Sequence, residues 1–196
     1  MPYEAQNFDH LLGTSGFSDQ LLKNHFTLYQ GYVTNTNKLL DTMMAMVKDN
    51  KANTPEFAEL KRRFGWEFNG MRLHEYYFGN MTKSPQSMKK DSALAQHMIK
   101  DFGSLEQWEN AFKAVGAMRG IGWVILCYDP LGKRLFNVWV NEHDVGHLAG
   151  AIPLLIMDVF EHAFMIDYGL KRADYITAFF HAIDWKVVMK RFDDIL

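Results

Sequence analysis

The sequence predicts an α+β fold, in which an N-terminal long antiparallel helical hairpin is followed by a C-terminal α/β lobe with a small three-stranded antiparallel sheet. The hairpin is predicted because apolar residues recur at spacings of three, four and seven in the first part of the chain. The sheet is predicted because short apolar runs bounded by turn residues follow the Gly120 to Gly122 segment. We expect two domains, 1–82 and 83–196.

Two long helices form the predicted hairpin. The first extends over 18–48, where no proline occurs and Ser18 is suited to the N-cap. A short polar segment predicts a turn, after which Pro55 takes the first position of a second helix that ends near Gly79. So short a connection between two long helices favours antiparallel packing.

The second half opens with a polar linker over 82–90 and two predicted helices, at 85–100 and 104–118. Ser104 and Gln107 have the spacing of a capping box at the start of the second of these helices.

The predicted strands come next. The segments 123–128 and 134–140 flank a turn at 129–132, and 151–159 is the third strand. The remainder, 168–196, is predicted to form helices and a loop.

Composition and charge limit the possible partners. The chain has 196 residues, 48% of them hydrophobic, and its 21 Lys and Arg residues against 23 Asp and Glu residues leave a net charge of −2. This composition excludes a disordered chain and argues against a nucleic-acid partner, because no basic excess is present to contact phosphates. No apolar stretch approaches the roughly 18 residues of a membrane span, so no membrane partner is expected.

The single cysteine, Cys127, excludes an intramolecular disulfide and any site built from several cysteines of one chain. The N-terminal residues lack the basic and long apolar regions of a secretory signal. We therefore expect a reducing, cytoplasmic location.

Candidate chemistry lies in an apolar run that contains Asp158, Glu161 and His162. A buried carboxylate needs a metal ion, a partner charge or several hydrogen-bond donors. Two interpretations are open from spacing alone: Asp158 caps a helix while Glu161 and His162 pair at the surface, or Asp158 and His162 bind a metal ion. In the second interpretation His25 and His74, on the two long helices, could supply further ligands.

The segment from Asp158 to Phe164 (DVFEHAF) resembles the D-x-W-E-H-A-F/Y segment of the iron/manganese superoxide dismutases, with Phe160 in place of the tryptophan. Other segments resemble the same family in the same order along the chain. They are Tyr32 to Asn37, Leu73 to Phe78, Gly122-Trp123, Asp174-Tyr175 and Asp184-Trp185.

The resemblance implies an antioxidant oxidoreductase that converts superoxide to O₂ and H₂O₂ by cycling one mononuclear Fe or Mn ion per chain between M³⁺ and M²⁺. It implies a metal site between the two domains, with His25, His74, Asp158 and His162 as the ligands. Three imidazoles and one carboxylate suit either ion.

The resemblance also assigns roles around the metal. Tyr32 and His143 are expected to deliver protons through solvent bound to the metal, because Gly70 stands where many relatives have a glutamine. A histidine at this place favours iron slightly. Arg172 is expected to attract superoxide at the entrance, and Glu161 to reach the partner chain of a homodimer or homotetramer. Packing around the site is assigned to Trp123, Phe160 and Tyr77.

Three departures from the family pattern are visible. Tyr32 follows His25 by one residue fewer than in the family, and an ungapped alignment places Asn24 at the ligand position. We expect His25 and a helix without a bulge, because seven residues are two helical turns. Leu28 or Tyr29 and Met165 stand where the family has a gateway histidine and tyrosine, and Phe160 replaces a tryptophan.

These departures keep two alternatives open. One is a mononuclear iron protein that acts on peroxide with weak dismutase activity. The other is a non-enzymatic homologue that is stabilised by its metal.

Overall fold

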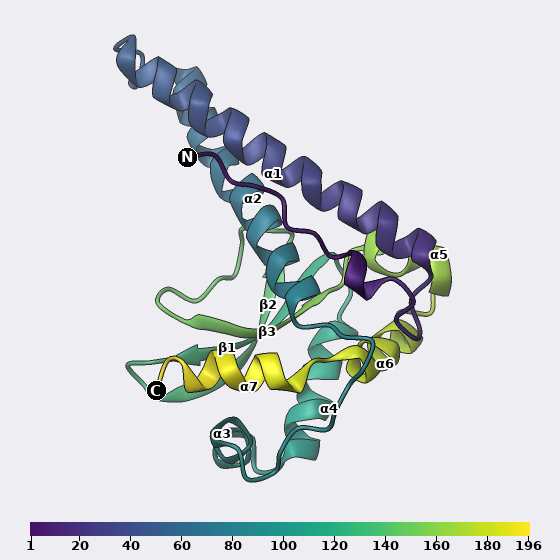
Figure 1. Ribbon diagram of the computed structural model, residues 1–196. Coiled ribbons are helices and arrows are strands. Elements are labelled where there is room, and N and C mark those ends of the chain that lie inside the picture. The colour runs from purple at the N-terminus through teal and green to yellow at the C-terminus, as the bar shows by residue number, and fades with distance from the viewer.

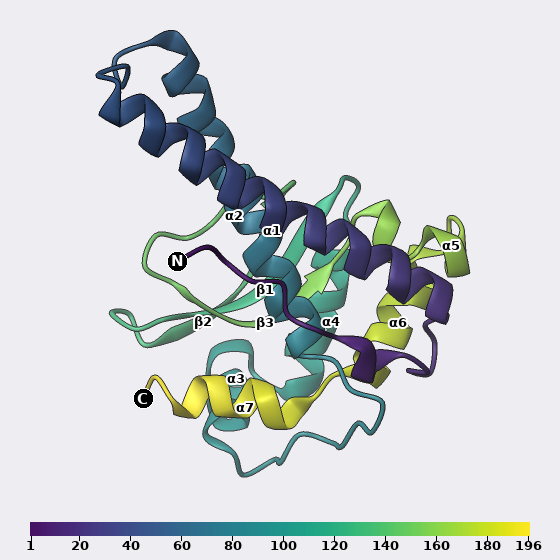
Figure 2. The same ribbon diagram turned by 45° about the horizontal axis from the view of Figure 1, so that its top comes forward.

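Two long antiparallel helices dominate the N-terminal part of the computed structural model, which describes residues 1–196 (Figure 1). Helix α1 comprises Asp19–Lys48 and α2 comprises Pro55–Gly79. Ser18 Oγ accepts the N–H of Leu21 at the start of α1, and Thr54 caps α2 in the same way. The far half of the hairpin projects beyond the rest of the molecule (Figure 2).

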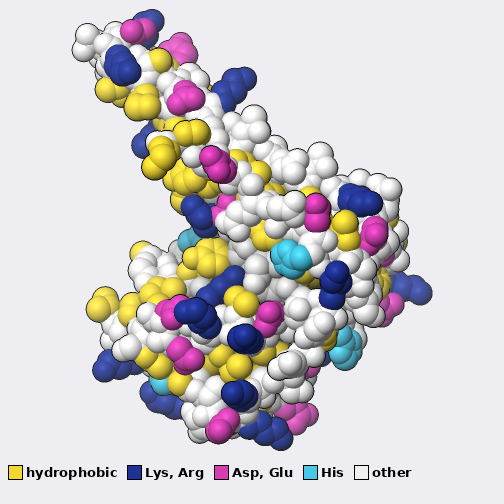
Figure 3. Space-filling model, in the orientation of Figure 1, with side chains coloured by type: hydrophobic (Ala, Val, Ile, Leu, Met, Phe, Trp, Pro, Cys, Tyr) yellow, Lys and Arg dark blue, Asp and Glu magenta, His cyan; other side chains and the backbone are white.

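The chain before α1 runs along the hairpin and contains a short 3₁₀ helix, η1, at Asp9–Leu11. Tyr3 is bound to Asn37 of α1 through its backbone N–H and C=O. On the face shown in Figure 3, hydrophobic side chains gather along the projecting half of the hairpin, and acidic and basic side chains are interspersed. Met44 and Val47 are exposed in this half of α1.

The sheet is three-stranded and antiparallel, with the order β2-β1-β3. Its strands are β1 (Gly122–Asp129), β2 (Arg134–Asn141) and β3 (Ile152–Asp158). The central strand β1 is almost wholly buried, as its apolar run predicted. Trp123 of β1 pairs with Asp158 of β3, which places that carboxylate at the end of the sheet nearest the hairpin. The predicted fold class is confirmed.

Short helices complete the C-terminal part. They are α3 (Ala93–Phe102), α4 (Leu105–Gly116), η2 (Glu161–Ala163), α5 (Met165–Tyr168), α6 (Arg172–Ala182) and α7 (Trp185–Asp193). Helices α3 and α4 contact β2, while α2 and α7 contact β3. One contiguous apolar core extends from η1 to α7. None of the helices combines the length and the apolar character needed to cross a bilayer. The division into 1–82 and 83–196 stays a prediction.

Three local predictions differ from the structure. The helix expected from residue 85 begins only at Ala93, because Ser92 accepts the N–H of Ala95 and so starts the helix there. At the start of α4, Ser104 accepts the N–H of Gln107 as expected, but the reciprocal bond of a full capping box is not formed. The third strand is shorter than predicted by one residue at each end.

Candidate metal centre

Four side chains from four separate elements meet beside the end of β3. His25 comes from α1, His74 from α2, Asp158 from β3 and His162 from η2, and their candidate ligand atoms all lie within 4.8 Å of one another. His25, His74 and Asp158 are buried, whereas the side chain of His162 is 28% exposed. The site is therefore closed to solvent on most sides and reachable beside His162.

All three imidazoles approach the same carboxylate oxygen. The Nε2 atoms of His25, His162 and His74 lie 3.2, 3.1 and 3.6 Å from Asp158 Oδ2. The other oxygen, Oδ1, accepts the backbone N–H of Phe160, which fixes the carboxylate plane. One cation at the centre of this group could contact all four side chains.

The side chain that α1 contributes to the cluster is His25 and not the neighbouring Asn24. Helix α1 is α-helical throughout, without a bulge between His25 and Tyr32. Asn24 is exposed, and its Oδ1 accepts a hydrogen bond from Gln20. A spacing of seven residues keeps His25 and Tyr32 on one face of the helix, as expected.

His74 supplies the sharpest sign that the group fits a cation. Its Nδ1 lies within hydrogen-bond distance of the Gly70 carbonyl, which can only accept, so the lone pair is on Nε2. Nε2 is buried and has no hydrogen-bond partner. An unpartnered buried acceptor is costly in the absence of a ligand. A metal ion at this position would satisfy it.

Charge in the cluster also fits a metal ion. Burial lowers the pKa of His25 and lowers that of His74 far below its usual value, so both imidazoles are neutral. Burial by itself raises the pKa of Asp158, but the interactions with His162 and His25 outweigh it and hold that pKa well below its usual range. Neutral imidazoles with one carboxylate form a donor set suited to Fe or Mn.

Tyr32 and His143 form a hydrogen-bonded pair next to this group. Tyr32 Oη lies 2.7 Å from His143 Nε2, and Trp123 Nε1 donates to His143 Nδ1 at 3.0 Å. Because an indole N–H can only donate, Nδ1 is the acceptor and neutral His143 carries its proton on Nε2. His143 therefore donates to Tyr32, whose own O–H is free for another acceptor.

Burial shifts the pKa values of Tyr32 and His143 in opposite directions, so neither residue changes its protonation state near neutral pH. It raises the pKa of Tyr32 to about 12 and lowers that of His143 to about 4. The Tyr32 ring stacks on His74 with a centroid distance of 5.3 Å. A protonated phenol is thus held against a candidate ligand.

Aromatic rings enclose the cluster. Phe160 stacks on both His143 and His162, with centroid distances of 4.8 and 5.0 Å. The rings of Trp123 and Tyr77 lie 4.9 Å from His74 and 5.4 Å from His25. The three residues expected to pack around the site therefore lie against its histidines.

Two residues at the site received no role from the sequence. Trp66 packs edge-on against His143 at 4.7 Å, and the Tyr175 hydroxyl donates to the Asp158 carbonyl at 2.6 Å. Trp66 lies eight residues before His74 on the same face of α2, and this helical spacing could have indicated it. Tyr175 belongs to a segment that resembles the family, but its contact with Asp158 joins α6 to β3 and could not be deduced from neighbouring residues.

Comparison with known proteins identifies the family of the chain. Residues 90–191 match the family described as iron/manganese superoxide dismutases, C-terminal domain. A protein of Aquifex pyrophilus named as an iron superoxide dismutase is 38% identical over 192 residues, which cover 94% of this chain and 89% of that protein. A protein of Haloferax volcanii named as manganese superoxide dismutase 2 is 35% identical over 195 residues, covering 98% and 93%.

The chain belongs to the iron/manganese superoxide dismutase family. The resemblance of its motifs is thereby confirmed, and it extends over nearly the whole chain. In this family member, Leu28 and Met165 are partly exposed, and neither apolar side chain offers the donor that a histidine or tyrosine would. Tyr29 is buried, and its hydroxyl donates to Glu75.

Two further predicted residues of this superoxide dismutase family member lie outside the cluster. The half-buried Arg172 donates to the carbonyls of Met118 and Gly120 at 2.7 and 2.8 Å. Glu161 is exposed and forms no ion pair within the chain. Their functional roles stay predictions.

Proposed function

We propose that the protein is a superoxide dismutase in which His25, His74, Asp158 and His162 bind one Fe or Mn ion. The observation that carries this proposal is the convergence of three imidazole nitrogens on Asp158 Oδ2 around the unpartnered Nε2 of His74. Family membership supports the reaction, because relatives of both metal types are named superoxide dismutases. The histidine at position 143 favours iron.

The chemistry that the bound ion supplies is one-electron exchange, which oxidises one superoxide to O₂ and reduces a second that leaves as H₂O₂ with two protons. The chain's own residues hold the charge and supply the protons. Asp158 stays ionised, and His25 and His74 stay neutral because they are buried. Their lone pairs are therefore available at neutral pH.

Proton supply is assigned to Tyr32 with His143 as its orienting partner. His143 Nε2–H donates to Tyr32 Oη, which leaves the phenol O–H able to donate toward the centre of the cluster. After donating a proton, the phenolate would keep the hydrogen bond from His143. This bond favours the charged form and lowers the cost of the transfer.

Assembly and access are proposed from the residues around this centre. The exposed carboxylate of Glu161, adjacent to His162 and without a partner in its own chain, supports a homodimer in which it reaches the partner chain. Arg172 keeps a positive charge near Phe164, with its guanidinium 5.4 Å from that ring, and we assign it to the attraction of superoxide.

The single buried thiol of Cys127 is consistent with a cytoplasmic antioxidant role. Burial also raises the pKa of this thiol to about 12, so little reactive thiolate is present.

The test is the rate of superoxide disappearance per bound metal ion, measured on protein loaded separately with iron and with manganese. We expect one form to approach the diffusional range of about 10⁸–10⁹ M⁻¹s⁻¹. His74→Ala should abolish metal binding and activity. His181→Ala, which removes an exposed histidine of α6, is the matched control and should change neither.

A second result would favour the alternative functions. If both metal forms bind the ion but remain orders of magnitude slower, the unusual residues Leu28, Phe160 and Met165 are decisive. Peroxide consumption by the iron form would then indicate a peroxide-active protein. Its absence would indicate a metal-stabilised homologue without this activity.

A further inference from the structure

Asn80, directly after α2, joins that helix to β3. It is fully buried, and its Oδ1 accepts the N–H of Ile156 at 2.9 Å. Its Nδ2 donates to the carbonyls of Ile156 at 3.2 Å and Tyr77 at 2.9 Å. The amide therefore pairs with both backbone groups of one β3 residue, as a neighbouring strand would.

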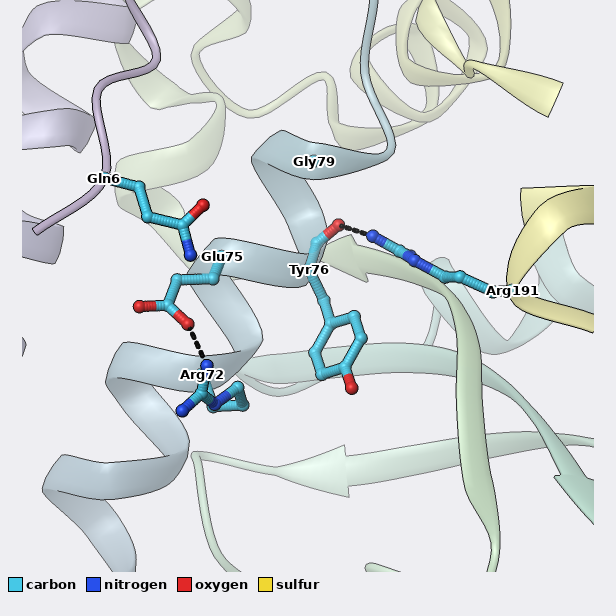
Figure 4. A pocket seen from close by; sticks show the side chains of 6 residues that line it. All are labelled: Gln6, Arg72, Glu75, Tyr76, Gly79 and Arg191. Atoms are coloured by element: carbon cyan, nitrogen blue, oxygen red, sulfur yellow. Dashed lines mark hydrogen bonds and ion pairs between the residues drawn. The ribbon is translucent and has the colours of Figure 1, made fainter. Parts of the chain in front are cut away.

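Arg191 of α7 binds the same two elements. Its Nη1 donates to the Leu154 carbonyl at 2.7 Å and lies 3.3 Å from Asn80 Oδ1, and its Nη2 donates to the Tyr76 carbonyl at 3.1 Å. Figure 4 shows the guanidinium directed at the end of α2. No carboxylate forms an ion pair with Arg191. Its guanidinium donors instead bind backbone carbonyls of α2 and β3 and hold these two elements in place.

These bonds lie close to two of the candidate ligands. His74 precedes Tyr76 by two residues on α2, and Asp158 follows Ile156 by two residues on β3. The separation of His74 Nε2 from Asp158 Oδ2, 3.6 Å, is the longest of the three imidazole–carboxylate distances. Apolar packing between α2 and β3 is non-directional, whereas hydrogen bonds with defined geometry fix both spacing and register.

We propose that Asn80 and Arg191 form a clasp that positions His74 relative to Asp158 and thereby increases the affinity of the site for its Fe or Mn ion. The inference rests on the proposed metal site. Neither residue of the clasp belongs to the cluster itself, so both act through the elements that carry the ligands. They are positioning residues.

A surface pocket makes Arg191, but not the fully buried Asn80, reachable from solvent. It has a volume of about 380 Å³ and is lined by Gln6, Arg72, Glu75, Tyr76, Gly79 and Arg191 (Figure 4). Gly79 leaves room for the guanidinium, because a Cβ at this position would lie 3.3 Å from Nη2 of Arg191. A free guanidinium ion could therefore enter the space left by a truncated Arg191 side chain.

The test measures Mn²⁺ affinity against a competing chelator, using the full chain at a temperature below unfolding. Arg191→Met keeps much of the apolar stem of the side chain but removes all the hydrogen-bond donors that Arg191 supplies to the clasp. We expect its Mn²⁺ dissociation constant to rise by about tenfold, at the lower end of the effect of losing an outer hydrogen bond at a metal site. Trp108→Phe is the matched control, because it removes a partly buried hydrogen bond to Asn137 that joins α4 and β2 away from the metal site. Its Mn²⁺ affinity should be unchanged.

Two further variants separate positioning from general stability. Arg191→Lys retains a cation that can reach only some of the acceptors, and we expect an intermediate dissociation constant. It also provides the comparison if Arg191→Met does not fold. In Arg191→Ala, millimolar guanidinium should restore part of the lost affinity, whereas the same concentration of NaCl should not. The absorption spectrum of the iron-loaded Arg191→Lys protein should shift relative to that of the wild type.

The outcomes distinguish this proposal from the proposed function. If the wild-type protein does not bind Mn²⁺ or iron, the metal site fails, and the clasp fails with it. If the wild type binds Mn²⁺ and Arg191→Met or Arg191→Lys binds it equally well, the clasp is overturned while the metal site stands. The clasp is overturned in that case even if the variant unfolds at a lower temperature than the wild type.

Discussion

Trp123 donates its indole N–H to Nδ1 of His143 at 3.0 Å and thereby determines which nitrogen of that imidazole carries the proton. The consequence reaches Tyr32, because only the Nε2–H form of neutral His143 donates to the phenol oxygen. A residue of the central strand thus controls the direction of a hydrogen bond at the edge of the metal centre.

Trp123→Phe should remove this control while retaining an aromatic ring. His143 would then exchange between tautomers, and Tyr32 would lose its orientation in part of the population. We expect the rate of superoxide disappearance per bound metal to fall by roughly 10–100-fold, the usual effect of losing a partner around a metal site. Stopped-flow kinetics with metal analysis would check this. An unchanged rate at full metal occupancy would contradict it.

Gly70→Ala should displace Tyr32. A Cβ at Gly70 would lie 2.5 Å from Cδ1 of the Tyr32 ring, so the ring must shift, which disturbs the 2.7 Å contact of its hydroxyl with His143. Overpacking of this kind costs about 1–3 kcal/mol, which exceeds the gain of about 1 kcal/mol from replacing glycine in a helix. We expect lower stability and lower activity, with metal binding retained. Urea unfolding and activity assays measure the two effects.

Gly65→Ala is the matched control for that substitution. It lies on the same helix, but a Cβ at Gly65 would meet no atom within 4 Å. The substitution should therefore raise the stability by up to about 1 kcal/mol and leave activity unchanged. Equal behaviour of the two variants would show that the contact with Tyr32 has no consequence.

The metal-free protein should become less stable as the pH falls below about 6.5, because burial holds the pKa of His143 at about 4. Between these values the unfolded chain binds a proton that the folded chain does not, so unfolding is favoured. This histidine alone accounts for a loss of about 2 kcal/mol between pH 7 and pH 5. Urea unfolding of wild type and His143→Gln should show a weaker pH dependence in the variant. Parallel pH profiles would refute the assignment.

Glu161→Ala should weaken self-association. The carboxylate is exposed and has no partner within its own chain, so we expect it to contact a second copy. Sedimentation at several protein concentrations should show more monomer in the variant than in the wild type. Glu4→Ala, at another exposed position, should sediment as the wild type does.

Local chemistry explains which parts of the fold were predictable. The caps at Ser18 and Thr54 and the alternation of apolar runs with turns depend on neighbouring residues, and these elements begin where the sequence indicates. The predicted helix start at residue 85 was wrong. Proline is common at the first position of a helix, so Pro85 resembles a helix start, but the cap is provided by Ser92.

The metal centre was predictable only in part. His25 and Asp158 lie 133 residues apart, and resemblance to a family, not spacing, brought them together. Asn80 and Arg191, 111 residues apart, were missed because neither belongs to a motif and their contact exists only in the folded chain. Long-range polar contacts leave no periodic signal in a sequence.

The same long separations affect how the metal centre forms during synthesis. Asp158 and His162 are the only pair of the cluster close in sequence, whereas His25 and His74 emerge from the ribosome much earlier. A nascent chain therefore exposes two isolated histidines and cannot assemble the complete site until β3 has been made and has paired with β1. Because the unfolded chain has no preformed site, uptake of the ion reports completed folding, and the stabilisation of the folded state grows with the logarithm of the free ion concentration once that concentration exceeds the dissociation constant.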